Sequence, residues 1–87
     1  MSEQTNEAPS SLVLFGAVWC PDVLMTRAYL DRQGIAYVYR DIDRDPDAMA
    51  TLLELRGEAW VVPTLVLANG TVLDNPSRRE LARRLGL

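Results

Sequence analysis

The short stretch WCPDV, residues Trp19–Val23, decides the fold, because it joins an apolar run to a helical segment. The run at 12–15 reads LVLF and, bounded by turn residues, is typical of a buried strand. Residues 21–33 are predicted to be helical, so Cys20 is expected at the junction between a strand and a helix. A thiol there faces unpaired backbone N–H groups and the positive end of the helix dipole, and both favour the reactive thiolate.

Cys20 is the only cysteine among 87 residues, and the chain has no histidine. This composition excludes an internal disulfide, a Cys-x-x-Cys zinc site, a Cys–His nucleophile pair and a histidine-ligated metal. A lone cysteine is more often a buried structural residue. Its place between a strand and a helix instead favours a reactive, partly exposed thiol.

The overall composition predicts one small domain, since 48% of the residues are hydrophobic. Nine basic against twelve acidic residues give a net charge of −3, which argues against a nucleic-acid partner. The first ten residues are polar, and no apolar stretch is long enough for a signal peptide or a membrane span. We therefore expect a cytoplasmic monomer without membrane contact, with a disordered tail at 1–10 and a domain at 11–87.

Further along the chain, composition and turn residues predict strands at 35–42, 60–67 and 71–73, and helices at 46–56 and from Ser77 onward. Asn69-Gly70 predicts a tight hairpin between the last two strands. The order β-α-β-α-β-β-α gives an α/β fold, a four-stranded mixed sheet with three helices on both faces. Apolar residues on several sides of the first helix predict that it is buried on several sides.

Four aspartates lie close together at Asp41, Asp43, Asp45 and Asp47. Such a cluster suggests a metal site, but a solvated helix start is the better interpretation. Asp45 is placed to cap a helix whose first position is Pro46.

The element order resembles the thioredoxin fold in its smallest form, the glutaredoxins, and several short motifs extend the resemblance to residues. Trp19–Pro21 is similar to the start of the family's redox motif. Val61–Pro63 is similar to its Thr-Val-Pro segment, whose proline is cis and faces the active cysteine. Asn69–Leu73 followed by Asn75–Ser77 most resembles the mycoredoxins, glutaredoxin relatives that use mycothiol.

Two positions depart from the family pattern. Val23 occupies the place of the usual second cysteine, which removes dithiol chemistry. Ala17 stands where glutathione-using glutaredoxins often have lysine, which weakens the case for glutathione. The resemblance therefore implies mycothiol or glutathione as co-substrate, with no tightly bound cofactor.

The resemblance also implies a set of site residues. Cys20 would be catalytic, and no metal ligand is expected. Arg27, Arg40 and Arg56 are surface charges, any one of which is able to meet a cofactor carboxylate. The residues expected to bind the substrate or the small thiol are Trp19, Pro21, Asp22, Val62, Pro63, Asp74, Asn75 and Ser77.

Three functions remain open at this stage. The first is a monothiol enzyme that reduces mixed disulfides between proteins and a low-molecular-weight thiol. The second is a thioredoxin-fold binding module without redox activity. The third, a [2Fe–2S] carrier, is the weakest, because Pro21 replaces the small residue usual after the cysteine of cluster-binding relatives. The expected partners are the small thiol and thiol-modified proteins.

Overall fold

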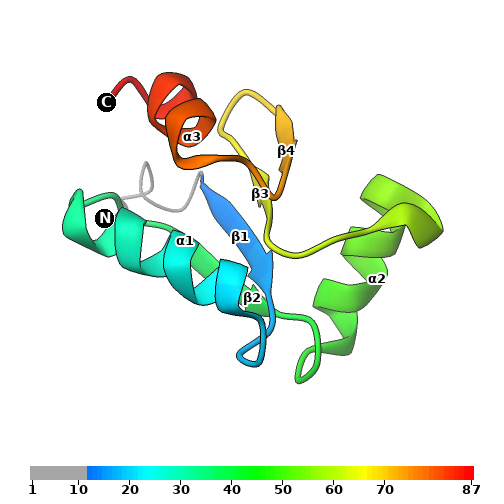
Figure 1. The fold of residues 1–87 in the computed structure, drawn as a ribbon. Helices are drawn as coiled ribbons and strands as arrows, with labels where there is room; N and C mark the ends of the chain where they lie inside the picture. Colours follow the sequence, from blue (N-terminus) through cyan, green and yellow to red (C-terminus); the bar gives the residue numbers. More distant parts are fainter. Residues whose placement is uncertain (1–11) are drawn as a thin grey trace, which may run out of the picture.

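The computed structural model describes residues 12–87, so the tail expected at 1–10, together with Ser11, lies outside the described residues. The predicted element order is confirmed (Figure 1). A short 3₁₀ turn at Gly57–Ala59 follows the second helix. The strands and helices are β1 (Val13–Gly16), α1 (Pro21–Arg32), β2 (Val38–Asp41), α2 (Pro46–Arg56), β3 (Thr64–Val66), β4 (Val72–Asp74) and α3 (Arg78–Leu85).

The four strands form one mixed sheet in the order β2-β1-β3-β4. β1 and β2 are parallel, while β1–β3 and β3–β4 are antiparallel. The predicted hairpin is confirmed: the Thr71 N–H donates to Asn69 Oδ1 at 2.9 Å, and Gly70 has a φ of 89°. This positive φ is one that glycine adopts readily, so the turn follows from the local sequence.

Helices cover both faces of the sheet, as predicted, with α1 and α3 on one face and α2 on the other (Figure 1). Adjacent residues of β1 point to opposite faces. Leu14 joins the core under α1 and α3, while Phe15 joins the core under α2. The site of interest lies on the α1 and α3 side.

Gly16 ends β1, one residue beyond the apolar run at 12–15, and its lack of a side chain is required there. A Cβ at this position would lie 2.7 Å from Val23 Cγ1 and 3.0 Å from Tyr39 Cε1. The first turn of α1 therefore packs directly against the end of β1, and this contact fixes where Cys20 sits.

Two strands are shorter than predicted, for separate reasons. The second does not begin at Ile35, because the Ile35 N–H donates to the Leu30 carbonyl and closes the C-terminus of α1, with Gly34 at a φ of 70°. The third begins only at Thr64, because Pro63 has no N–H for a ladder.

The prediction that α1 is buried on several sides is wrong. Val23, Tyr29 and Leu30 are buried, but Leu24 and Met25 are 52% and 62% exposed. Among residues 12–87, α3 is the only helix beside α1 on this face of the sheet, and the outer side of α1 meets solvent. Apolar side chains therefore lie on the surface within two turns of Cys20.

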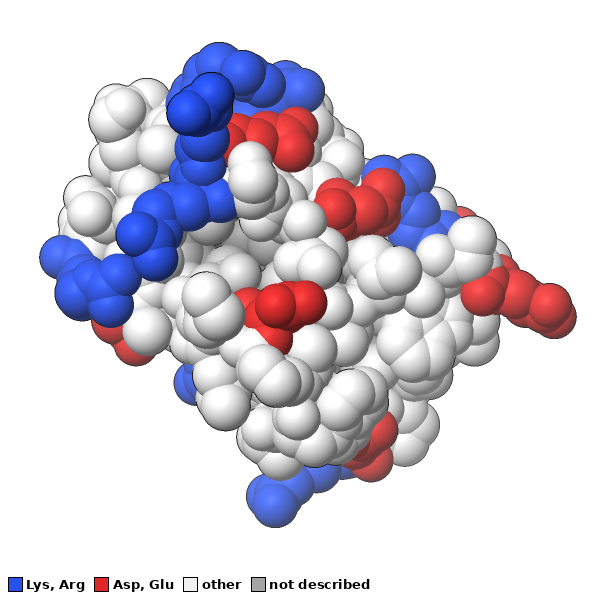
Figure 2. Space-filling model, in the orientation of Figure 1, with Lys and Arg blue, Asp and Glu red and all other residues white. Residues whose placement is uncertain are grey.

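Charge is unevenly distributed over the described residues. α3 reads RRELARRL, four arginines against one glutamate, in a chain of net charge −3. Figure 2 shows the arginines gathered along α3 and beside the hollow between α3 and α1. Within residues 12–87, no helix has the length and apolar character needed to cross a membrane.

Candidate functional site

Cys20 is the N-cap residue of α1, with an extended backbone (φ −92°, ψ 117°) and Pro21 in the first helical position. Its N–H donates to the Ala17 carbonyl, and its own carbonyl accepts from the Leu24 N–H, both at 3.2 Å. Its side chain makes no capping hydrogen bond. The Cys20 thiol is therefore left to make other contacts.

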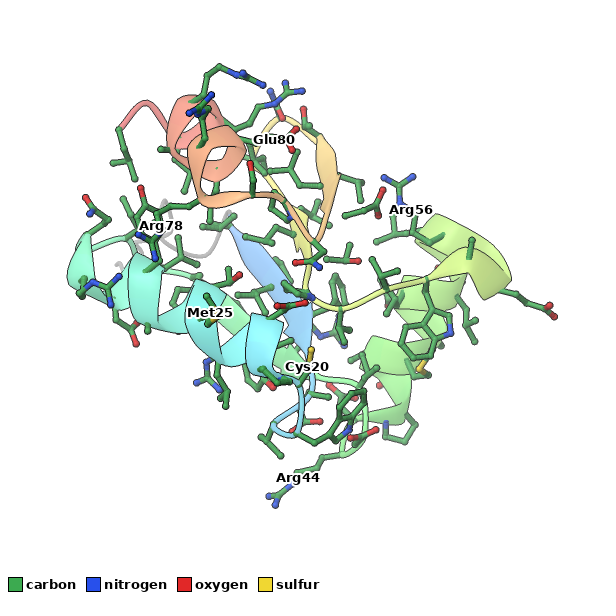
Figure 3. All side chains as sticks on the ribbon, viewed as in Figure 1. Cys20, Met25, Arg44, Arg56, Arg78 and Glu80 are labelled. Atoms are coloured by element: carbon green, nitrogen blue, oxygen red, sulfur yellow. The ribbon has the colours of Figure 1, made fainter. Side chains whose placement is uncertain are left out.

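The Cys20 thiol turns toward the segment that leads into β3 (Figure 3). Its Sγ donates to the Val62 carbonyl at 3.8 Å, and the Val62–Pro63 peptide is cis, as predicted. The expectation of a partly exposed thiol is wrong, because Cys20 is only 9% exposed and its sulfur faces the Val62 carbonyl. Cys20, Val62 and Pro63 form the centre of the candidate site.

Asn75 connects this centre to the first turn of α1. Its backbone N–H donates to the Pro63 carbonyl at 2.7 Å, and its Nδ2 donates to Asp22 Oδ2 at 3.1 Å. Asn75 has a φ of 41°, in the left-handed region that asparagine tolerates better than most residues. The structure thus joins Asp22, Pro63 and Asn75 around the thiol.

Trp19 and Asp74 are partnered away from the thiol. The Trp19 indole is 63% exposed and donates from Nε1 to Asp43 Oδ2 at 2.6 Å. Asp74 forms an ion pair with Arg56, whose Nε lies 2.8 Å from Oδ1. Neither side chain contacts Cys20 through a hydrogen bond in the described structure.

Ser77 and Pro21 have local roles at helix starts. Ser77 Oγ accepts from the Glu80 N–H at 3.1 Å and caps α3. Pro21 is exposed at the first position of α1.

A groove of about 350 Å³ opens between α1 and the start of α3. It includes three of the predicted site residues, Asp22, Asn75 and Ser77. Sequence reasoning missed the other lining residues because the position of α3 relative to α1 is set by packing. Those residues are Met25, Thr26, Tyr29, Pro76, Arg78 and Leu81.

Arg27, which the sequence offers as a cofactor contact, is engaged on α1 and β2 instead. Its Nε donates to the Tyr37 hydroxyl at 3.3 Å, and its guanidinium carbon lies 3.9 Å from the centre of the Tyr39 ring. The hydrogen bond to Tyr37 raises the pKa of Arg27 above its usual value.

Arg40 and Arg56 are also paired with acidic partners. Arg40 pairs with Asp45 at 3.3 Å, and Arg56 with Asp74. The cation that lines the groove is Arg78, whose guanidinium carbon lies 5.5 Å from the Tyr29 ring centre (Figure 3).

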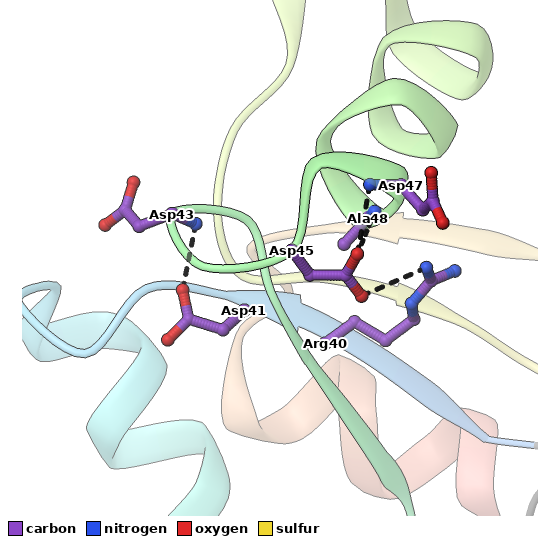
Figure 4. A network of polar contacts seen from close by, with 6 residues as sticks. All are labelled: Arg40, Asp41, Asp43, Asp45, Asp47 and Ala48. Atoms are coloured by element: carbon purple, nitrogen blue, oxygen red, sulfur yellow. Dashed lines mark hydrogen bonds and ion pairs between the residues drawn. The ribbon is translucent and has the colours of Figure 1, made fainter.

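The aspartate cluster organises the start of α2, as interpreted from the sequence (Figure 4). Asp45 Oδ1 accepts from the Asp47 and Ala48 N–H groups at 3.0 and 3.3 Å. Burial raises the pKa of Asp45, but the Ala48 N–H, Arg40 and the Asp47 N–H outweigh it, so the pKa falls below 3.8. Among residues 12–87, no group of acidic, cysteine or histidine side chains is arranged to hold a metal ion.

Comparison with known proteins gives consistent results. The glutaredoxin family model matches residues 12–73. Two Mycobacterium tuberculosis proteins, from different strains and both named as glutaredoxins, are 30% identical over 76 residues, which cover 87% of this chain and 90% of each relative.

Solved structures agree on the fold. A thioredoxin-like protein superimposes with a TM-score of 0.78 at 21% identity, covering 87% of this chain and 95% of that one. A glutaredoxin from Archaeoglobus fulgidus gives 0.72 at 16% identity, covering 97% and 98%. With a thiol at the start of a helix beside a cis-proline, and with these matches, the chain belongs to the glutaredoxin family.

Proposed function

We propose that this glutaredoxin is a monothiol thiol-disulfide oxidoreductase that reduces mixed disulfides between proteins and a low-molecular-weight thiol. Glutaredoxins use glutathione-like thiols as co-substrates and act on thiol-modified proteins. The observation that carries the proposal is the position of Cys20 Sγ, 3.8 Å from the carbonyl of Val62 and beside Pro63, with a buried Val23 in place of a second thiol.

The reaction needs one protein thiol and two molecules of the small thiol. The Cys20 thiolate attacks the small-thiol sulfur of the mixed disulfide, a new S–S bond forms, and the protein sulfur leaves as a thiolate that takes up a proton. A second small thiolate then attacks the adduct, forms the small-thiol disulfide and releases Cys20. The two electrons that reduce the protein come from the small thiol.

The backbone around Val62 is available to hold an incoming chain. β3 begins at Thr64, so Val62 lies outside the sheet beside the thiol. An extended substrate is able to pair with such a segment through main-chain hydrogen bonds, which give affinity with little sequence preference. Cys20 must turn from the Val62 carbonyl to reach the substrate sulfur.

The charges around the thiol favour a neutral small thiol such as mycothiol. Asp22 lies at the end of the groove nearest to Cys20, and Ala17 supplies no cation. Glutathione carries two carboxylates against one ammonium group, so Asp22 repels its net negative charge, whereas mycothiol carries no carboxylate.

One observation favours the competing function of a binding module. Cys20 is 9% exposed and its thiol is already hydrogen-bonded, which is the usual environment of a structural cysteine. The oxidoreductase turns over mixed disulfides and the binding module does not. An assay of mixed-disulfide reduction therefore separates the two functions.

The test measures reduction of a peptide mixed disulfide with mycothiol or glutathione as the modifying and regenerating thiol. We expect turnover that is faster with mycothiol, and a gain for glutathione in Ala17→Lys. Absence of turnover with both thiols would favour the binding module. An iron–sulfur absorption band in the purified protein would favour the cluster carrier.

A further inference from the structure

The groove between α1 and α3 has opposite charges at its two ends. Asp22 stands at the end next to Cys20, and Arg78 stands farther along, against Tyr29. Between them the walls are mixed: Met25, 62% exposed, and Leu81, part of the core beneath, are apolar, while Thr26, Asn75 and Ser77 are polar. The groove is therefore polarised along its length, starting beside the reactive thiol.

We propose that this groove docks a segment of the substrate protein that carries an apolar residue and then an acidic residue beyond the modified cysteine. The proposal rests on the proposed function, because it assigns the protein part of the mixed disulfide to this groove. The apolar side chain packs against Met25 and Leu81, and the acidic side chain pairs with Arg78. Residues next to the modified cysteine are neutral or basic, because they pass Asp22.

The length of the groove sets the spacing. Asp22 and Tyr29 are seven positions apart on α1, which corresponds to about 10 Å along a helix. An extended peptide covers that distance in about three residues. The acidic residue is therefore expected about four positions from the modified cysteine.

Charge and position favour a protein segment over a nucleic acid or a membrane. The arginine-rich surface is confined to α3 in a chain of net charge −3, and Asp22 lies within the same groove. A nucleic acid or an anionic membrane binds best to a continuous basic surface, and Asp22 interrupts such a surface in this groove. A short segment with one acidic end matches both charges.

The experiment uses two peptides that differ at one position, one with glutamate and one with glutamine four residues from a cysteine. Each is prepared as the mixed disulfide with the small thiol, and kcat/KM is compared. At low ionic strength we expect the glutamate peptide to be preferred about threefold to fivefold, with a smaller preference at high salt. Arg78→Gln should bring the ratio to about one.

Arg83→Gln is the matched control, because it removes the same charge from α3 at a residue outside the groove lining. It should keep the preference for the glutamate peptide. Equal kcat/KM for the two peptides with wild-type protein, or equal loss of preference in both variants, would overturn the proposal.

Docking is also read without turnover, by NMR titration of ¹⁵N-labelled protein with peptides that carry serine in place of the cysteine. We expect the glutamate peptide to shift the amide signals of Met25, Tyr29 and Leu81 and to bind more tightly than its glutamine partner. If these signals shift but the protein shows no turnover, the proposed function is contradicted and the docking proposal stands. Tighter binding by a single-stranded oligonucleotide at the same residues would overturn the docking proposal.

Discussion

α1 and α2 begin with the same backbone arrangement and use it differently. Cys20 and Asp45 are both extended N-cap residues followed by a proline in the first helical position. Asp45 accepts two backbone N–H groups of its own helix (Figure 4), whereas Cys20 makes no such bond and turns to Val62. The free N–H groups at the start of α2 are hydrogen-bonded by the side chain of its N-cap residue. Those at the start of α1 receive no such bond from their N-cap residue.

This difference shows how the Cys20 thiol is kept out of the capping contacts of its own helix. A Cys20 side chain that capped α1 would stabilise the helix, but its thiol would then be turned away from Val62 and Pro63. α1 is held instead by contacts from elsewhere. Val23 packs over the side-chain-free Gly16, and Asn75 ties Asp22 to Pro63.

Exchanging the Cys20 sulfur for oxygen should have the largest effect. Cys20→Ser is expected to lower mixed-disulfide reduction by about a thousandfold or more, because no nucleophile remains. Serine is a good N-cap residue, so the melting temperature should stay the same or rise. Residual turnover close to wild type would show that the chemistry does not depend on Cys20.

Removing the cap of α2 should affect stability and leave turnover nearly unchanged. Asp45→Ala is expected to lower the melting temperature by several degrees at pH 7, because two N–H groups and Arg40 lose their partner. The folded state lowers the pKa of Asp45 below 3.8, so its contribution is fully present well above pH 3.8 and is lost as pH falls through the lowered value.

The measurement is thermal unfolding of both proteins from pH 7 down to about pH 2. The gap between wild type and Asp45→Ala should be constant near neutrality and should narrow below pH 3.8. A gap independent of pH would show that the charge of Asp45 does not contribute.

Local features of the fold were predictable from sequence, because each depends on neighbouring residues. The prolines at the helix starts and the Asn69-Gly70 turn placed α1, α2 and the hairpin. The second strand was predicted too long, since β-branched and aromatic composition does not reveal that Ile35 closes the helix before it.

The candidate site was only partly predictable, because its contacts join residues far apart in the chain. Asn75 and Asp22 are separated by 53 positions, and Trp19 and Asp43 by 24. The sequence indicated Asn75 and Trp19 but not their partners. Arg78 was missed altogether, since nothing local distinguishes it from the other arginines of α3.

Removing the Asn75 side chain, which links α1 to the cis-proline segment, should have a smaller effect than Cys20→Ser or Asp45→Ala. Asn75→Gly keeps a left-handed φ accessible and deletes the bond to Asp22. We expect kcat/KM to fall about fivefold, the value of one hydrogen bond, with a modest loss of stability. Asn75→Asp, which places a second carboxylate against Asp22, should lose more. An unchanged kcat/KM in both variants would remove Asn75 from the site.

The central claim, turnover by a single thiol, is tested most directly by giving the chain the missing second cysteine. In Val23→Cys, the two thiols are three residues apart across the first turn of α1 and are able to form a disulfide. We expect wild-type protein to reduce mixed disulfides with a small thiol, and Val23→Cys to do so at nearly the same rate while gaining reduction of protein disulfides. Wild-type protein that is inactive with both mycothiol and glutathione, with activity restored in Val23→Cys, would contradict the account.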